Sequence, residues 1–231
     1  MILGASGGGE AETPLRPVRV WDLPTRLVHW LIAALVPFSW WSATHDHLSW
    51  HRLSGYALMG LLAFRLIWGV VGSSTARFSR FVAGPRTVLA YTRGRLGEGR
   101  IGHNPLGGWS VIALLTVLTL QIGLGLFAVD EDAIEAGPLS KFVSFDTGRA
   151  ITHWHHEIFW VLVALITVHL VAILIYTLRR KTLVGPMITG VARLSPSLAA
   201  PALASRTRVI IAAALAASLT WFVAHGLSFR T

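Results

Sequence analysis

The sequence of 231 residues contains no cysteine. This absence excludes a covalently attached c-type haem, a thiolate-ligated iron–sulfur cluster and any disulfide within the chain. Histidine, which occurs ten times, is then the strongest remaining side-chain ligand for a transition metal.

Charged residues are also scarce, at 13% of the chain. The long apolar segments contain almost no carboxylates, and only Glu157 lies near one of them, at its end. Histidines within such segments could serve a membrane transporter or sensor that binds metal ions or protons without haem. A protein of this class would also use carboxylates inside the segments to accept cations. The sequence therefore gives this alternative little support.

Hydrophobic residues, in contrast, make up 53% of the chain and form runs too long for the core of a small soluble protein. A membrane-spanning helix needs roughly 20 apolar residues. Four strong candidates and a probable fifth follow, at about 27–44, 53–72, 107–128, 156–178 and 207–225. The expected fold is an all-α integral membrane protein, a four-helix transmembrane bundle with a fifth C-terminal helix.

The net charge of +9 comes from basic residues in particular loops, which is the pattern of the positive-inside rule and not of a nucleic-acid-binding face. These loops and the N-terminus are expected in the cytoplasm, in a bacterial inner membrane. A fifth span would place the C-terminus outside. The basic residues are Arg16, Arg19, Arg26, Arg77, Arg80, Arg86, Arg93, Arg95, Arg100, Arg179, Arg180, Lys181, Arg193, Arg206 and Arg208.

The loop between the third and fourth spans is acidic and is expected outside the cytoplasm. Its segment from Asp130 to Glu135 could dock a basic partner such as a c-type cytochrome. A solvated loop without a partner is the plainer interpretation. The acidic residues are Asp130, Glu131, Asp132, Glu135 and Asp146.

His155 and His169 lie fourteen residues apart on the fourth apolar segment. Fourteen residues are close to four helical turns, so both rings fall on nearly one face and are separated by roughly 21 Å along the axis. A histidine in the middle of an apolar span is costly and points to function. Relative to His169, helical phase places His155 about 40° away and its neighbours His153 and His156 about 160° and 140° away.

Two further histidines occupy matching depths on the first two spans. With a cytoplasmic N-terminus, His29 lies at the level of His169, and His51 at the level of His155. His51 competes with His45 and His47 on the same short loop. It is favoured because Gly55, four residues later, leaves room on the helix for a flat macrocycle. This arrangement suits two stacked haems, each held between a pair of helices.

His103 and His225 lie at span ends and are interpreted as structural, with contact between His103 and a quinone as a weaker alternative. Asn104 and Pro105 are expected to cap the third span. Gly123 and Gly125 in the same span could admit a porphyrin or simply allow close helix packing.

Haem propionates need cationic partners when they lie near hydrocarbon. Arg26, Arg52 and Arg65 are the candidates, because Arg26 precedes His29 by three residues and Arg52 follows His51 directly. Arg65 lies fourteen residues after His51, at the level of the inner haem. Each could instead extend its side chain toward the lipid headgroups.

Five segments then resemble one family in order. They are VRVWDLPTRLVHW around His29, HRLSGYALMGLLAFRLIWGVVG from His51, GHNPLGGW from Gly102, FDTGRAITHWHHEIFW before His169, and the later VGPMITG. They resemble the bacterial cytochrome b561 family and the related b-type cytochrome subunits of membrane-bound nickel–iron hydrogenases. The resemblance covers roughly residues 18–191.

The resemblance implies two non-covalent b haems, both ligated by two histidines, and carries the ligands over to His29, His51, His155 and His169. It implies single-electron transfer between a periplasmic redox partner, such as a c-type cytochrome, dehydrogenase or hydrogenase, and quinone. The expected organisation is a disordered tail at 1–17, a di-haem domain at 18–191, and a linker with the fifth helix at 192–231. Whether the chain is a quinone-linked oxidoreductase alone, a homodimer or a subunit of a larger complex stays open.

Overall fold

The computed structural model describes residues 14–95, 101–132 and 135–227. It contains five helices that are long and apolar enough to cross a membrane, as the sequence predicts. They are α1 (Leu23–Thr44), α2 (Leu48–Val71), α5 (Pro105–Phe127), α6 (Phe145–Leu178) and α8 (Arg206–Ala224). The protein is an all-α integral membrane protein, and its apolar outer faces contact lipid.

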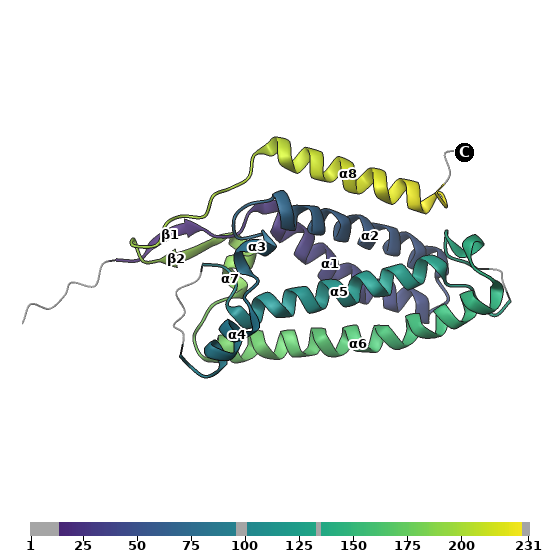
Figure 1. Cartoon of the computed structure of the whole chain (residues 1–231), viewed down its shortest axis with the longest axis horizontal. Helices are drawn as coiled ribbons and strands as arrows, with labels where there is room; N and C mark the ends of the chain where they lie inside the picture. Colours follow the sequence, from purple (N-terminus) through teal and green to yellow (C-terminus); the bar gives the residue numbers. More distant parts are fainter. Residues whose placement is uncertain (1–13, 96–100, 133–134, 228–231) are drawn as a thin grey trace, which may run out of the picture.

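The five helices run side by side along the long axis of the molecule (Figure 1). Helices α1 and α2 are joined by a short turn and pack against each other, and α5 packs against α6. Helix α8 lies along α2, on the side of the bundle away from α6 (Figure 1). Helix α2 therefore has neighbours on more than one side, and it is the most buried of the five.

Side-chain caps fix where several spans begin. The side chain of Asp22 accepts a hydrogen bond from the backbone N–H of Thr25, and the side chain of Asn104 accepts one from Gly107. Asn104 and Pro105 therefore start α5 as the sequence predicts. Ser144 caps α6, which begins at Phe145, eleven residues before the expected start of the span. The 34 residues of α6 extend for roughly 50 Å, so part of the helix projects beyond a hydrocarbon core of about 30 Å.

Short elements gather at one end of the bundle (Figure 1). They are β1 (Arg16–Arg19), β2 (Val191–Leu194), α3 (Phe78–Phe81), α4 (Pro85–Thr92) and α7 (Val184–Thr189), while the 3₁₀ turn Ser140–Phe142 lies in the loop between α5 and α6.

The two strands form an antiparallel pair that the sequence did not predict. Arg16 and Pro17 belong to β1, so the expected disordered tail at 1–17 extends too far by at least these two residues. Residues 1–13 lie outside the described part of the chain.

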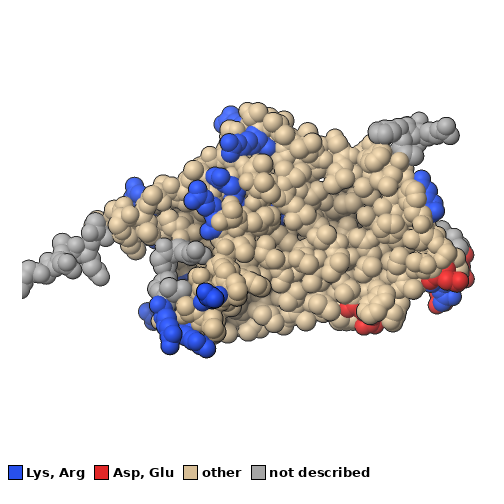
Figure 2. Space-filling model, in the orientation of Figure 1, with Lys and Arg blue, Asp and Glu red and all other residues tan. Residues whose placement is uncertain are grey.

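The two ends of the bundle differ in charge (Figure 2). On the face shown, Lys and Arg predominate at the end that carries the short elements, and Asp and Glu appear only toward the opposite end. We refer to them as the basic end and the acidic end. Their separation follows the loop charges of the sequence and is typical of a membrane protein with a fixed orientation.

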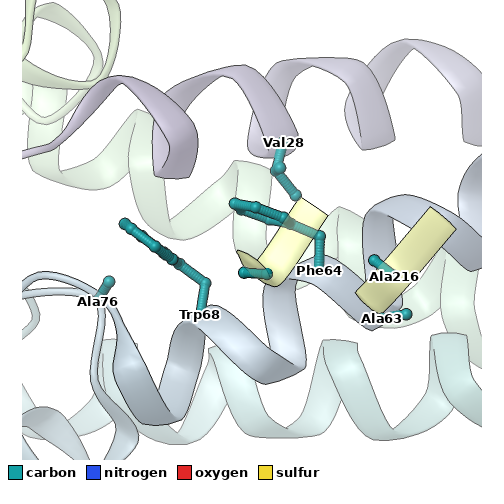
Figure 3. Packing of buried hydrophobic residues seen from close by; sticks show 7 residues of the cluster. Val28, Ala63, Phe64, Trp68, Ala76 and Ala216 are labelled. Carbon is teal, nitrogen blue, oxygen red and sulfur yellow. The ribbon is translucent and has the colours of Figure 1, made fainter. Parts of the chain in front are cut away.

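A core near the basic end joins α1, α2 and α8. The indole of Trp68, which is 1% exposed, stacks on Phe64 with 5.5 Å between ring centres (Figure 3). Ala212 and Ala216 of α8 are buried in the same cluster. Small residues let helices approach closely in a membrane, where packing contacts replace the hydrophobic effect as the main attraction. The core therefore attaches α8 firmly to α2.

Candidate functional site

Two of the predicted histidines face each other near the acidic end. The ring centres of His51 on α2 and His155 on α6 are 6.1 Å apart, and the ring planes are nearly perpendicular, at 87°. A metal–imidazole bond is about 2 Å long, so one metal ion between two rings separates the ligating nitrogens by about 4 Å and the ring centres by more. The spacing of His51 and His155 suits one shared metal ion.

Backbone carbonyls hold both of these rings. Nδ1 of His51 lies 2.9 Å from the carbonyl oxygen of Ser39, and Nδ1 of His155 lies 2.9 Å from that of Gln121. A carbonyl oxygen can only accept, so each Nδ1 carries the proton and donates it. Nε2 of each ring then keeps its lone pair for a metal, which is the usual way in which a protein orients a metal-binding histidine.

Neighbouring side chains add to this arrangement. The Ser39 hydroxyl lies 3.1 Å from Nδ1 of His51. The side-chain NH2 of Gln121 lies 3.2 Å from Nε2 of His155, so a bond from Nε2 to a metal would replace this contact. A Cβ built on Gly125 would approach Cε1 of His155 to 3.0 Å, so the absence of a side chain there makes room for this ring. Ser39 and Gln121 were not predicted as site residues. They hold the histidines through backbone carbonyls, which every residue type has, so the sequence does not distinguish these positions.

The competing histidines point elsewhere. His153 and His156 are exposed, whereas His155 between them is partly buried. His45 and His47 are likewise exposed beside the partly buried His51. His155, which helical phase favours, and His51, which Gly55 favours, are therefore the partly buried histidines of their groups.

His29 on α1 and His169 on α6 lie nearer the basic end than the first pair does. His29 lies within electrostatic range of His169 and of Arg65, and its Nδ1 is buried without a hydrogen-bond partner among the described residues. Its ring meets Trp30 edge-on, with 4.9 Å between ring centres. Among the described residues, Nδ1 of His29 thus lacks the carbonyl contact that orients the rings of His51 and His155.

His103 belongs to the same region. Burial, with a smaller contribution from the positive charge of Arg65 and of His169 or His29 when protonated, lowers its pKa to about 3. Its ring packs against Trp21 and Phe81, with ring centres 4.8 and 4.4 Å away. His103 is therefore neutral at physiological pH, and its Nδ1 is buried without a partner in the described part of the chain.

The three predicted arginines occupy different surroundings. Arg65 is buried, donates to the carbonyl oxygen of Ala76 at 3.3 Å and lies over the ring of Phe78, so it turns into the protein instead of extending to the headgroups. Arg26 donates to the carbonyl oxygen of Ile188. Arg65 thus lies within electrostatic range of His29, and it forms no direct ion pair with a described carboxylate.

Arg52 is occupied at the acidic end, where it forms an ion pair with Glu135. Glu131 approaches Arg149 at 3.4 Å, with its side chain 87% exposed. Two of the acidic residues expected to dock a partner are therefore engaged within the chain, although Glu131 stays accessible.

The glycines expected beside a macrocycle border open space. A Cβ built on Gly55 or Gly123 would meet no atom within 4 Å. A flat tetrapyrrole could therefore approach α2 and α5 closely at these two positions. Among the described residues, no group of three or more His, Asp or Glu side chains gathers as a metal site. The donor set is therefore one of facing histidine pairs, which suits haem iron.

Comparison with known proteins identifies the family. No curated protein and no solved structure matches the chain, but the model of the family described as prokaryotic cytochrome b561 matches residues 20–190. The match includes α1, α2, α5, α6 and all four histidines, and it ends before α8. The chain therefore belongs to the prokaryotic cytochrome b561 family and is a membrane protein that binds b-type haem and transfers electrons.

Proposed function

We propose that the protein binds two b haems and carries single electrons through the bacterial inner membrane. The ligands are His51 and His155 at the acidic, periplasmic end, and His29 and His169 nearer the basic, cytoplasmic end. The observation that carries the proposal is the facing pair His51 and His155, whose Nδ1 atoms both donate to backbone carbonyls.

Haem b with two histidine ligands exchanges one electron at a time and has no open position for dioxygen. The backbone carbonyls of Ser39 and Gln121 orient the rings of His51 and His155. These hydrogen bonds also increase the basicity of Nε2 toward the iron. Leu62, Leu118 and Leu162 form a buried cluster between α2, α5 and α6, which excludes water from the middle of the bundle. Near the basic end, Arg65 supplies a positive charge for a haem propionate.

Electrons pass between a periplasmic partner and the quinone pool. The partner is a c-type cytochrome, a dehydrogenase or a hydrogenase, and the protein works alone or as the membrane subunit of such a complex. The exposed carboxylate of Glu131 and the adjacent acidic loop offer a surface to a basic partner. Residues 18–191 form the di-haem unit, with a cytoplasmic N-terminus.

Haem stoichiometry tests the proposal. The purified full-length protein is expected to contain two haems b per chain in the pyridine haemochromogen assay. A redox titration should resolve two components of similar amplitude, since the two histidine pairs differ in burial and in hydrogen bonding. One haem per chain would contradict the di-haem assignment while leaving the family intact. A spectrum without b-type bands would contradict haem binding itself.

A further inference from the structure

A groove between α2 and α8 opens at the basic end of the bundle. It has a volume of about 420 Å³. Its walls are apolar and come from Ile67 and Val70 of α2 and from Ile211 and Leu215 of α8, whereas Arg77 and Arg208 line it with positive charge. The groove thus combines an apolar channel along the membrane with two guanidinium groups.

The two arginines carry charge that no described carboxylate neutralises. Among the described residues, Nε of Arg77 is buried without a hydrogen-bond partner, and Arg208 donates only to the carbonyl oxygen of Val71, at 3.3 Å. Neither forms an ion pair with a described carboxylate. Because a buried guanidinium donor is costly without an acceptor, the groove favours an anionic ligand.

The walls of the groove are firmly placed. Ser74 donates through its backbone N–H to the carbonyl oxygen of Ala202 at 2.9 Å, and the Ser73 hydroxyl accepts from the backbone N–H of Ala204 at 3.0 Å. These bonds attach the segment before α8 to the end of α2. Further along the two helices, Gly60 lies so close to Thr220 that a Cβ would approach its hydroxyl to 3.1 Å. The groove therefore has a defined width and is not an opening between loosely packed helices.

The apolar walls face the lipid phase. Val70 is 69% exposed, and Ile211 and Leu215 are more than half exposed. Residues this apolar contact acyl chains in a membrane. The arginines lie at the end of the spans, at the depth where lipid phosphates are found. An amphiphile with a phosphate head and a hydrocarbon tail matches both parts of the groove.

We propose that this groove binds an anionic phospholipid. The phosphate lies between Arg77 and Arg208 and accepts charge-assisted hydrogen bonds from both, while one acyl chain runs between α2 and α8 along Val70, Ile211 and Leu215. Since α8 lies outside the family match, the lipid site is a feature that the C-terminal helix adds to the part of the chain that matches the family.

Lipid retention tests this proposal. The haem-loaded, full-length protein is purified in detergent, and phosphatidylglycerol and phosphatidylcholine are titrated against it in native mass spectrometry. The wild type should retain phosphatidylglycerol in preference to phosphatidylcholine. Arg77→Gln with Arg208→Gln should weaken phosphatidylglycerol binding by roughly twentyfold, because each arginine near an anionic head contributes about a fivefold factor. Inorganic phosphate should not displace the lipid, since it lacks the acyl chain.

Matched variants separate this site from general attraction to charge. Arg80→Gln with Arg86→Gln removes the same charge at the same end from exposed positions outside the groove and should leave lipid retention unchanged. Arg77→Lys with Arg208→Lys should retain most of the binding.

Equal retention of the lipid by the Gln pair and the wild type would overturn the proposal, as would displacement by inorganic phosphate. If the Gln pair fails to fold, a photoreactive phosphatidylglycerol is crosslinked to the wild type instead. The crosslinks should map to the facing residues of α2 and α8, and crosslinks that map elsewhere would overturn the proposal.

Discussion

A His169→Ala variant is expected to bind one haem b per chain where the wild type binds two. Removal of one ligand leaves His29 without a partner across the inner site, and a single neutral imidazole does not hold the iron in a six-coordinate state. The outer pair, His51 and His155, keeps its carbonyl-bound orientation, since both contacts are local to the acidic end. Pyridine haemochromogen analysis and redox titration measure the loss of one component.

The complementary variant, His155→Ala, should remove the outer haem and keep the inner one. His153→Ala and His156→Ala are matched controls on the same stretch of α6, and both should retain two haems because these side chains are exposed. In reconstituted vesicles, the rate of electron transfer across the membrane should fall to background in both His155→Ala and His169→Ala.

A folded, monodisperse His169→Ala protein that had lost both haems, or neither, would contradict the pairing of His29 with His169. Retention of both haems by His155→Ala together with loss of one in His153→Ala would instead show that helical phase had selected the wrong histidine. Size-exclusion chromatography distinguishes these outcomes from a failure to fold.

The spans and the choice of His155 were accessible from the sequence because both depend on local periodicity. An apolar run of about 20 residues has one stable solution in a bilayer, a helix whose backbone groups are satisfied internally. Once α6 is a helix, the phase that separates His155 from His153 follows from 3.6 residues per turn. Their different exposures in the structure agree with this inference.

Contacts between segments distant in sequence were not accessible. Strands β1 and β2 have four residues each and lie 171 residues apart, so neither gives a periodic signal. Arg52 was expected near a haem propionate, but its ion pair with Glu135 joins positions 83 residues apart. The level of Arg65 along the bundle axis follows from its spacing of fourteen residues from His51 on one helix. Its contact with Phe78, in contrast, depends on how the chain turns after α2.

The acceptors of the outer histidines illustrate a different limit. Any residue at position 39 or 121 would offer a carbonyl group, so residue type carries no information on this contact. The carbonyls become available because neighbouring spans bring them to the ring nitrogens of His51 and His155. Composition therefore identifies a ligand more readily than it identifies the group that orients the ligand.

Trp68→Ala should destabilise the protein by about 3 kcal/mol or more. Trp68 is almost completely buried, and its removal leaves Phe64 without a stacking partner. The indole Nε1–H also donates to Oδ2 of Asp22 at 3.0 Å, so the substitution leaves a buried carboxylate oxygen without this donor. Since lipid is as apolar as a protein core, the cost comes chiefly from lost packing and this hydrogen bond.

The same carboxylate links Trp68 to the inner histidines. Asp22 caps α1, and His29 lies only seven residues further along that helix. We therefore expect Trp68→Ala to lower occupancy of the inner haem before that of the outer one as temperature rises. Thermal loss of the two redox components, followed separately, measures this order.

Two further variants divide the effect of Trp68 into its parts. Trp68→Phe keeps an aromatic ring against Phe64 but cannot donate to Asp22. Its free energy of unfolding should therefore fall by roughly 1 to 3 kcal/mol, which is the cost of losing the hydrogen bond and leaving its acceptor unpaired. Trp154→Ala removes the same side chain from a position that is 58% exposed and should leave stability nearly unchanged. If Trp68→Ala were as stable as Trp154→Ala, the packing of α1, α2 and α8 around this indole would not determine the stability of the inner site.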